Sequence, residues 1–109
     1  MKQKAVITAK FTIGQLIEHR LFGYRGVIFE VDPYFMLTDE WYEQVAKLRP
    51  PRNEPWYQVM PDKMRNTTYV AQQNLRLDRS RRPITHPDIG QVFVEFRNGV
   101  YLLDQRDIQ

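Results

Sequence analysis

Hydrophobic and polar residues alternate in the first third of the chain with the period of two that is typical of β-strands. Residues 15–20 form a first alternating run and residues 27–32 form a second. In the second run Val27, Phe29 and Val31 share one face, and β-branched and aromatic residues dominate it. The pattern predicts two strands that fold back on each other.

A short glycine-containing segment separates these two strands. Gly23 and Gly26 lie three positions apart where the backbone must turn, and glycine adopts the positive φ angles of tight turns without strain. Asp32-Pro33 ends the second strand, because proline cannot donate a hydrogen bond to a neighbouring strand. This opening is typical of small, strongly bent SH3-like barrels.

The middle of the chain carries a different period, with apolar residues three or four positions apart. Thr38 is expected to cap the N-terminus of a short helix, whose first turn holds two acidic residues. Trp41, Val45 and Leu48 then fall on one face of this helix. The helix is expected to end before Pro50, because the residue preceding a proline is disfavoured in the helical conformation.

Short runs of strand-forming residues recur in the second half of the chain. Gly90 marks a turn into one of them, and Asn98-Gly99 is a strong signal for a two-residue hairpin. Near the N-terminus, an edge segment is expected through Ala5-Val6-Ile7. The remaining expected elements are strands over residues 56–60, 67–71, 91–96 and 100–103, and a single helical turn over residues 72–74.

These elements predict a mainly β protein. We expect a single domain over residues 1–109, with an SH3-like barrel of about five strands over residues 11–77 and one short inserted helix. A basic linker over residues 78–89 would lead to an extra C-terminal β-hairpin over residues 90–104. That hairpin could pair within one chain or between two copies, so a homo-oligomer stays open. The expected core contains Ile17, Val27, Phe29, Val31, Tyr57, Val59, Tyr69 and Ala71.

Composition narrows the range of functions. The chain of 109 residues has a net charge of +3, which permits nucleic-acid or acidic protein partners without requiring either. It contains no cysteine, so disulfides, thiolate metal sites and cysteine nucleophiles are excluded. No apolar run approaches the roughly 20 residues of a membrane helix, and the N-terminus does not resemble a secretory signal. We therefore expect a cytoplasmic protein with no membrane association.

Residues that could carry out catalysis are few. His19, His86 and Ser80 are the only histidines and serine, and none has a partner at the spacing that nucleophilic or metal-assisted catalysis uses. No glycine motif matches a phosphate-binding fingerprint. We expect a non-enzymatic binding module with no catalytic residue, no metal and no cofactor.

Several motifs together resemble one family. They are IGQ at residues 13–15, EHR at 18–20, LFGYRGVI at 21–28, DP at 32–33, PWYQV at 55–59 and TYVAQQNL at 68–75. In order and at this spacing they resemble the HspQ/YccV-like family of small bacterial heat-shock proteins, which are also described as hemimethylated-DNA-binding proteins. The resemblance covers residues 11–77. From His86 to Leu103 the chain is more similar to the longer form of the domain at the end of certain eukaryotic F-box proteins.

The resemblance to HspQ implies a regulatory role in protein quality control. Such a protein would act as an adaptor or specificity enhancer of an ATP-dependent protease of the Lon class, and sometimes as its substrate. SH3-like domains often bind extended chains along an edge strand or an aromatic groove. Four aromatic residues around the helix and the following strand are candidates for that contact: Phe35, Trp41, Tyr42 and Trp56.

The family description as a DNA-binding protein implies an alternative. Candidates for DNA contact are Arg20, Tyr24, Arg25, Arg49, Arg52, Lys63 and Arg65, which combine cations on turns with one aromatic ring. A single methyl group distinguishes hemimethylated DNA, and burying it contributes at most about 1 kcal/mol. Strong selectivity would therefore need DNA shape readout or base flipping.

A third hypothesis is a partner-recruiting interaction domain, which the F-box-like end of the chain suggests. Because the chain begins with Met1 and has no F-box, a free-standing protein is the expectation. Surface chemistry should separate these hypotheses. A contiguous exposed aromatic patch favours protein binding, and a continuous stripe of arginine favours DNA.

Overall fold

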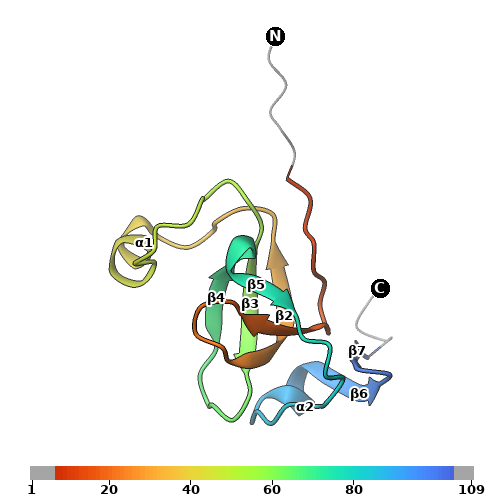
Figure 1. Cartoon of the computed structure of the whole chain (residues 1–109). Helices are drawn as coiled ribbons and strands as arrows, with labels where there is room; N and C mark the ends of the chain where they lie inside the picture. The colour runs from red at the N-terminus through yellow and green to blue at the C-terminus, as the bar shows by residue number, and fades with distance from the viewer. Residues whose placement is uncertain (1–6, 105–109) are drawn as a thin grey trace.

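A five-stranded antiparallel sheet forms the centre of the molecule (Figure 1). The computed structural model describes residues 7–104, so Ala5 and Val6 of the expected edge segment lie outside the described residues. The strands run in the order β4-β3-β2-β1-β5 across the sheet. Their bounds are β1 (Leu16–His19), β2 (Arg25–Asp32), β3 (Trp56–Pro61), β4 (Thr68–Ala71) and β5 (Leu75–Leu77).

The sheet is strongly curved but does not close into a barrel. β4 pairs only with β3 and β5 only with β1, and the 3-10 helix η1 (Gln72–Asn74) connects these two edge strands. Val70 of β4 and Leu75 of β5 nevertheless belong to one buried cluster, whose other members are Ile17, Ile28, Tyr57 and Val59. The mainly β class, with its short helix and C-terminal hairpin, is thus confirmed, and the closed barrel is corrected to an open, bent sheet.

An irregularity in β2 changes the expected core. The pairing of β2 with β3 shifts register between Ile28 and Glu30, so the strict alternation of faces breaks at Phe29. Val27 and Ile28 are both fully buried although they are neighbours in sequence, because they belong to two different buried clusters and both faces of the sheet are covered here. Phe29 and Val31 are only partly buried against the core. The other six expected core residues are buried: Ile17, Val27, Tyr57, Val59, Tyr69 and Ala71.

The two glycines of the first hairpin have different roles. Gly23 lies in the turn and has a φ of +77°. Gly26 lies inside β2, without a positive φ, where an added Cβ would come within 2.7 Å of the Met60 carbonyl oxygen. The expectation of a turn glycine at Gly26 is therefore wrong. Its missing side chain permits β2 and β3 to approach closely.

The inserted helix α1 (Asp39–Val45) begins as the sequence predicts. The Thr38 hydroxyl accepts a hydrogen bond from the backbone N–H of Trp41 at 3.1 Å. The face predicted from the apolar period is not the buried one: Tyr42 is the buried helical residue, while Val45 and Leu48 are 55% and 57% exposed. The helix stops at Val45, so Leu48 leaves the helical face on which the period placed it. No helix within residues 7–104 is long and apolar enough to cross a membrane.

The C-terminal hairpin folds against its own chain. It consists of β6 (Phe93–Arg97) and β7 (Val100–Leu103), joined by Asn98 and Gly99, both with positive φ. The backbone N–H of Tyr101 donates to the Gly14 carbonyl at 2.9 Å. Phe93 and Tyr101 complete a second buried cluster with Leu16, Val27, Met60 and Ile84. The expected start of this strand at residue 91 is corrected, since a short helix, α2 (Ile89–Val92), precedes β6.

Candidate functional site

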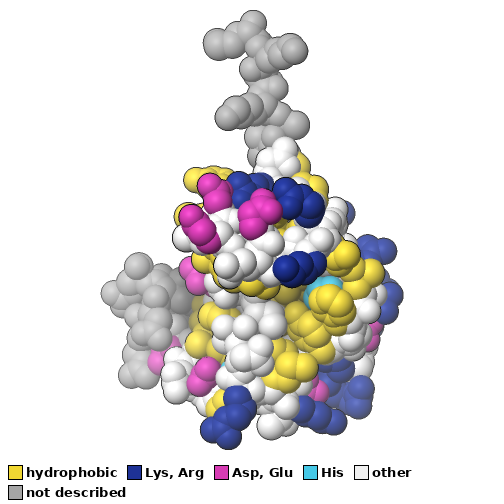
Figure 2. Space-filling model, turned by 90° about the vertical axis from the view of Figure 1, so that its left-hand side faces the viewer, with side chains coloured by type: hydrophobic (Ala, Val, Ile, Leu, Met, Phe, Trp, Pro, Cys, Tyr) yellow, Lys and Arg dark blue, Asp and Glu magenta, His cyan; other side chains and the backbone are white. Residues whose placement is uncertain are grey.

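A cleft of about 580 Å³ opens between α1 and the sheet. Its floor is β4, one wall is α1 with the segment that follows it, and the other wall is the turn between β1 and β2. Figure 2 shows hydrophobic side chains gathered around this hollow. We call it the α1–β4 cleft. Its lining includes His19, Phe22, Tyr24, Leu37, Trp41, Val45, Ala46, Lys47, Leu48, Pro50, Trp56, Gln58, Thr68, Tyr69, Val70, Ala71 and Asn74.

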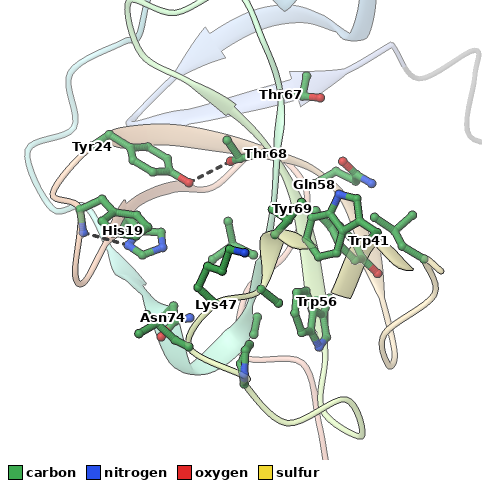
Figure 3. A pocket seen from close by; sticks show the side chains of 18 of the residues that line it. His19, Tyr24, Trp41, Lys47, Trp56, Gln58, Thr67, Thr68, Tyr69 and Asn74 are labelled. Atoms are coloured by element: carbon green, nitrogen blue, oxygen red, sulfur yellow. Dashed lines mark hydrogen bonds between the residues drawn. The ribbon is translucent and has the colours of Figure 1, made fainter. Parts of the chain in front are cut away.

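An aromatic cluster fixes the α1 wall. The Trp41 ring packs edge-on against Trp56 and Tyr69, with ring centroids 6.1 and 5.7 Å apart. Phe35 packs behind them, against all three rings. The Tyr69 hydroxyl donates to the Asp32 carboxylate at 2.6 Å, and burial together with this bond raises the pKa of Tyr69. These contacts hold the edge of β4 and α1 in one fixed arrangement (Figure 3).

A buried histidine organises the opposite wall. The His19 Nδ1 accepts hydrogen bonds from the backbone N–H groups of Leu21 and Phe22, at 3.2 and 3.1 Å. This arrangement requires an unprotonated Nδ1, and burial lowers the pKa of His19. The Phe22 ring stacks on the imidazole with centroids 4.5 Å apart, yet Phe22 is 73% exposed. His19 thus holds an aromatic side chain in solvent at the edge of the cleft.

Tyr24 ties this turn to the floor of the cleft. The hydroxyl groups of Tyr24 and Thr68 lie 2.9 Å apart in a hydrogen bond (Figure 3). Burial raises the pKa of Tyr24 despite that bond, so its hydroxyl stays neutral at physiological pH. The two walls and the floor are therefore connected by specific side-chain contacts.

Exposed apolar side chains also line the rim of the cleft. Leu37, Val45 and Leu48 project from the α1 side, and all three are exposed. Lys47 is the one lysine or arginine that lines the cleft, no aspartate or glutamate lines it, and Figure 3 shows Lys47 between the aromatic wall and Asn74. The cleft is therefore apolar with a single cation.

A separate basic surface lies on two neighbouring loops. The β3–β4 turn and the linker that follows β5 are joined by a backbone hydrogen bond from Lys63 to Thr85 at 2.8 Å. The linker's arginines and the turn's cations are exposed, and none of them forms an ion pair within residues 7–104. We call this set the basic loops: Lys63, Arg65, Arg79, Arg81 and Arg82.

Comparison with known proteins places the chain in a family. The family model described as "Hemimethylated DNA-binding protein YccV like" matches residues 9–100. The chain belongs to the YccV-like family. It is also 33% identical over 94 residues to "F-box only protein 21" of Pongo abelii, Homo sapiens and Mus musculus. That alignment covers 84% of this chain but only 15% of each relative.

The four aromatic candidates for protein binding have different positions in the YccV-like domain. Trp41 and Trp56 both line the cleft, but Trp56 is fully buried, so Trp41 is the one of the four that is partly exposed there. Phe35 and Tyr42 are buried behind the cleft, where they position α1. Sequence reasoning did not find Phe22 or Leu48 as site residues. In the sequence Phe22 looks like any other turn residue. Only its stacking on His19 in the structure identifies it as a candidate site residue.

Arg25, a candidate for DNA contact, is instead an internal support. Its guanidinium pairs with Asp62 and Asp78 and also donates to the Arg82 carbonyl, and its side chain is 16% exposed. Burial acts to raise the pKa of Asp78, but hydrogen bonds from Ser80 and Arg25 outweigh it and the pKa is lowered. These bonds attach the linker to the sheet, so this guanidinium is not available to a phosphate group.

The other DNA candidates do not form one surface. Arg49 pairs with Glu43, and Arg52 pairs with Asp39. The Arg52 guanidinium also lies 4.3 Å from the centre of the Tyr42 ring, over its face. The remaining candidates are Tyr24, which lines the cleft, Arg20, which is exposed beside it, and Lys63 and Arg65, which belong to the basic loops.

No arrangement for metal-assisted catalysis is present in the part of the chain that the structure describes. Within residues 7–104 no group of three or more histidine and carboxylate side chains is placed to hold a metal ion. His86 lies in the linker, where its Nδ1 accepts from the Asp88 N–H at 3.1 Å and its Nε2 contacts the Asn66 carbonyl at 2.7 Å. These bonds account for both ring nitrogens as contacts that hold the linker on the β3–β4 turn.

Proposed function

We propose that this YccV-like domain is a non-enzymatic interaction module that holds a segment of another protein in the α1–β4 cleft. The observation that carries the proposal is the set of apolar side chains kept exposed around one hollow. Single exposed apolar residues are normal on protein surfaces, but a contiguous group around a concavity marks a binding surface. Phe22, Leu37, Val45 and Leu48 form such a group from both walls.

The rigidity of the cleft supports the same proposal. Phe22 is held by His19, and Trp41 is held by Trp56 and Tyr69, so the apolar surface exists before any partner arrives. A preformed site binds with a smaller entropic cost than one that must be ordered. This favours recognition of a flexible partner segment by a rigid groove.

A peptide selection tests the proposal directly. Random twelve-residue peptides displayed on phage would be selected on the wild-type protein after depletion on a Phe22→Asp/Leu48→Asp variant. Leu48→Asp should change the free energy of unfolding by no more than about 0.5 kcal/mol, because Leu48 is exposed. Phe22→Asp also loses the stacking on His19, at about 0.5–1.5 kcal/mol, so a thermal melt must first show that the double variant is folded. Val94→Asp, at an exposed apolar position on β6, is the matched control. We expect enriched peptides that bind wild type and the control but not the cleft variant. Absence of enrichment would contradict the proposal.

A more specific form of the proposal makes the domain a regulatory adaptor or specificity enhancer, and at times a substrate, of a Lon-class protease in the cytoplasm. The resemblance to the HspQ family supports it, since an adaptor needs a surface for an exposed chain segment. We expect the domain to raise the rate at which a bacterial Lon-class protease degrades β-casein. The Phe22→Asp/Leu48→Asp variant should not raise the rate of β-casein degradation above that of the protease alone. No rate change with the wild-type domain would contradict this form and leave the wider proposal standing.

DNA binding is the second candidate function, and the basic loops favour it together with the description of the matching family model. Five exposed cations on two adjacent loops suit contacts with phosphate groups. Fluorescence anisotropy with unmethylated, hemimethylated and fully methylated copies of one duplex tests it. A preference for the hemimethylated duplex that Arg79→Ala/Arg81→Ala/Arg82→Ala removes would support this function. Equal, weak binding to all three duplexes would reduce it to nonspecific attraction.

A further inference from the structure

The floor of the α1–β4 cleft offers almost no backbone to an occupant. Three of the four residues of β4 are buried: Tyr69, Val70 and Ala71. Trp41 and Ala46, from the α1 side, pack against the aromatic cluster to which Tyr69 and Ala71 belong. Among the described residues, an occupant of the cleft therefore meets side chains and no strand edge with which its own backbone could pair.

This burial of the floor decides which conformation suits the occupant. An extended segment would bring unpaired backbone N–H and C=O groups against apolar walls, and a polar backbone group that leaves water without a partner costs free energy. A helix forms its backbone hydrogen bonds internally, so it buries only side chains. A helical segment is therefore the occupant that this cleft accommodates at the smallest cost.

The length of the cleft suits two or three turns of such a helix. Its lining includes every residue of β4 and continues to Asn66 and Thr67 at one end and to Asn74 at the other. The four residues of β4 span about 14 Å at about 3.4 Å per residue. About nine helical residues cover the same distance at about 1.5 Å per residue. Three apolar side chains spaced three or four positions apart fall within it.

Exposed apolar side chains stand on both sides of this axis. Val45 and Leu48 are exposed on the α1 wall, and Phe22 is exposed on the opposite wall, where its ring stacks on His19. A row of apolar side chains on one face of a helix would enter between these walls, and the polar face would stay in solvent. The two walls are thus complementary to an amphipathic helix.

The charge at one end of the cleft indicates a further feature of the occupant. Lys47 lines the cleft near Asn74, no aspartate or glutamate lines it, and Lys47 forms no ion pair within residues 7–104. Arg20 is exposed beyond the same end, where its backbone N–H donates to the Asn74 carbonyl at 2.8 Å. A carboxylate beside the apolar row of the helix would therefore meet a cation and no like charge.

We propose that the α1–β4 cleft binds an amphipathic helical segment of a partner protein, about nine residues or longer, with an acidic side chain beside its apolar row. The apolar row lies between Phe22 and Leu48, and the acidic side chain lies near Lys47. This inference rests on the function proposed above and specifies the conformation and charge of its ligand. The peptides enriched by the phage selection should carry apolar residues three or four positions apart, at least one acidic residue, and no proline between the apolar ones.

Substitutions in the peptide test the helix without altering the protein. The probe is a fluorescein-labelled synthetic copy of the most enriched peptide, and its Kd is measured by anisotropy. Proline at a central position of the polar face should raise the Kd by about tenfold or more, because proline inside a helix removes a hydrogen bond and clashes with the preceding turn. Alanine at the same position is the matched control and should change the Kd by less than about twofold. A lactam bridge between two polar-face side chains four positions apart should lower the Kd, because it preorganises the helix.

Charge reversal tests the carboxylate near Lys47. Lys47→Glu should weaken binding by about threefold or more, and replacing the acidic residue of the peptide with lysine should restore affinity for this variant. Lys63→Glu, at an exposed lysine that does not line the cleft, is the matched control and should bind the peptide as wild type does. Losses of equal size in both variants would show attraction to the overall positive charge and would overturn the placement of the carboxylate.

The outcomes separate this inference from the function on which it rests. Peptides that require Phe22 and Leu48, tolerate the central proline and lose affinity with the lactam bridge would bind in an extended conformation. That result would overturn the helix and leave the cleft as the binding site. No enriched peptide at all would overturn both proposals. A dimer in sedimentation experiments that Phe22→Asp/Leu48→Asp dissociates would assign the cleft to a second copy of the chain and overturn the partner segment.

Discussion

The α1–β4 cleft and the basic loops adjoin each other but use their side chains in opposite ways. The cleft exposes apolar side chains and carries a single lysine, and the basic loops carry five cations without a partner carboxylate among the described residues. They meet at the β3–β4 turn, where Asn66 and Thr67 line the cleft and Lys63 and Arg65 belong to the basic loops. A chain of net charge +3 therefore contains two surfaces with unlike chemistry.

The contrast between these two surfaces shows that residue type alone does not identify a binding residue. Arg25 has the side chain that suits a phosphate contact, yet its guanidinium forms ion pairs with Asp62 and Asp78. Phe22 has the side chain expected in a core, yet it is held in solvent. Which side chains are free is decided by tertiary contacts, and the predictions below test that assignment for each surface.

Gly26→Val should have the largest effect, because it disrupts the sheet beneath both surfaces. The added side chain would collide with the Met60 carbonyl in the adjacent strand, so we expect a loss of more than about 4 kcal/mol in the free energy of unfolding. Gly23→Val is the matched comparison. Nothing lies within 4 Å of its added Cβ, so only the positive φ is strained, at about 1–2 kcal/mol. Urea unfolding of both variants measures the difference, and equal losses would contradict the distinct roles assigned to the two glycines.

Arg25→Met should have the next largest effect, on stability and not on a binding contact. The carboxylates of Asp62 and Asp78 are largely buried, and the substitution removes the cation that pairs with them. We therefore expect the free energy of unfolding to fall by about 3 kcal/mol. Arg79→Met, in the basic loops, should change the free energy of unfolding by at most about 0.5 kcal/mol. Thermal and urea melts provide the measurement. If the Arg25→Met protein is as stable as wild type but has lost affinity for DNA, Arg25 contacts DNA and is not an internal support.

Salt should separate the two surfaces more sharply than any single substitution. Binding of a DNA duplex through the basic loops should weaken as KCl rises from 50 to 200 mM, with a slope of about 0.9 in log affinity per phosphate contact. Binding of an apolar peptide in the cleft should change by less than about threefold over that range, since only Lys47 interacts through charge. Anisotropy titrations at four salt concentrations measure both slopes. Equal slopes would show that one surface serves both ligands.

Local patterns predict much of this fold because they report local geometry. The Thr38 cap, the helical turn at η1 and the Asn98-Gly99 turn all depend on the φ, ψ preferences of a few residues. Where prediction was wrong, a longer-range contact decided the outcome. The register shift after Ile28 depends on pairing with β3, and the buried face of α1 depends on aromatic rings from three other segments.

The candidate site was only partly predictable for the same reason. Trp41, one of the four aromatic candidates, lines the cleft and is partly exposed, whereas Phe35, Tyr42 and Trp56 are buried. The position of β4 at the edge of the sheet, beside α1, follows from strand order, which the strands' sequences do not determine. Phe22 becomes a site residue only because His19, three positions earlier, accepts its backbone N–H and stacks on its ring.

Lowering the pH should weaken peptide binding in the cleft, because His19 becomes protonated, and should not weaken DNA binding by the basic loops. Burial lowers the pKa of His19 below that of the unfolded chain, so the unfolded state binds the proton more readily. Stability contributed by neutral His19 is therefore complete above the unfolded value of about 6.5 and is lost as the pH falls below it. Protonation also removes the acceptor for the N–H groups of Leu21 and Phe22, which should loosen the turn wall. Peptide affinity should consequently stay constant above about pH 6.5 and fall as His19 becomes protonated at lower pH.

The matched variant for this effect is His19→Asn, whose side-chain oxygen can accept the same N–H groups but does not titrate. It should weaken peptide binding at pH 7, because the stacking on Phe22 is lost, and then show a flatter pH profile than wild type. DNA affinity through the basic loops should not fall over the same range, since arginine and lysine stay charged. If the pH profiles of wild type and His19→Asn coincide, His19 is not the titrating group and the turn wall is held by packing. If DNA binding falls in parallel with peptide binding, the acid effect is on the whole fold and the two surfaces are not independent.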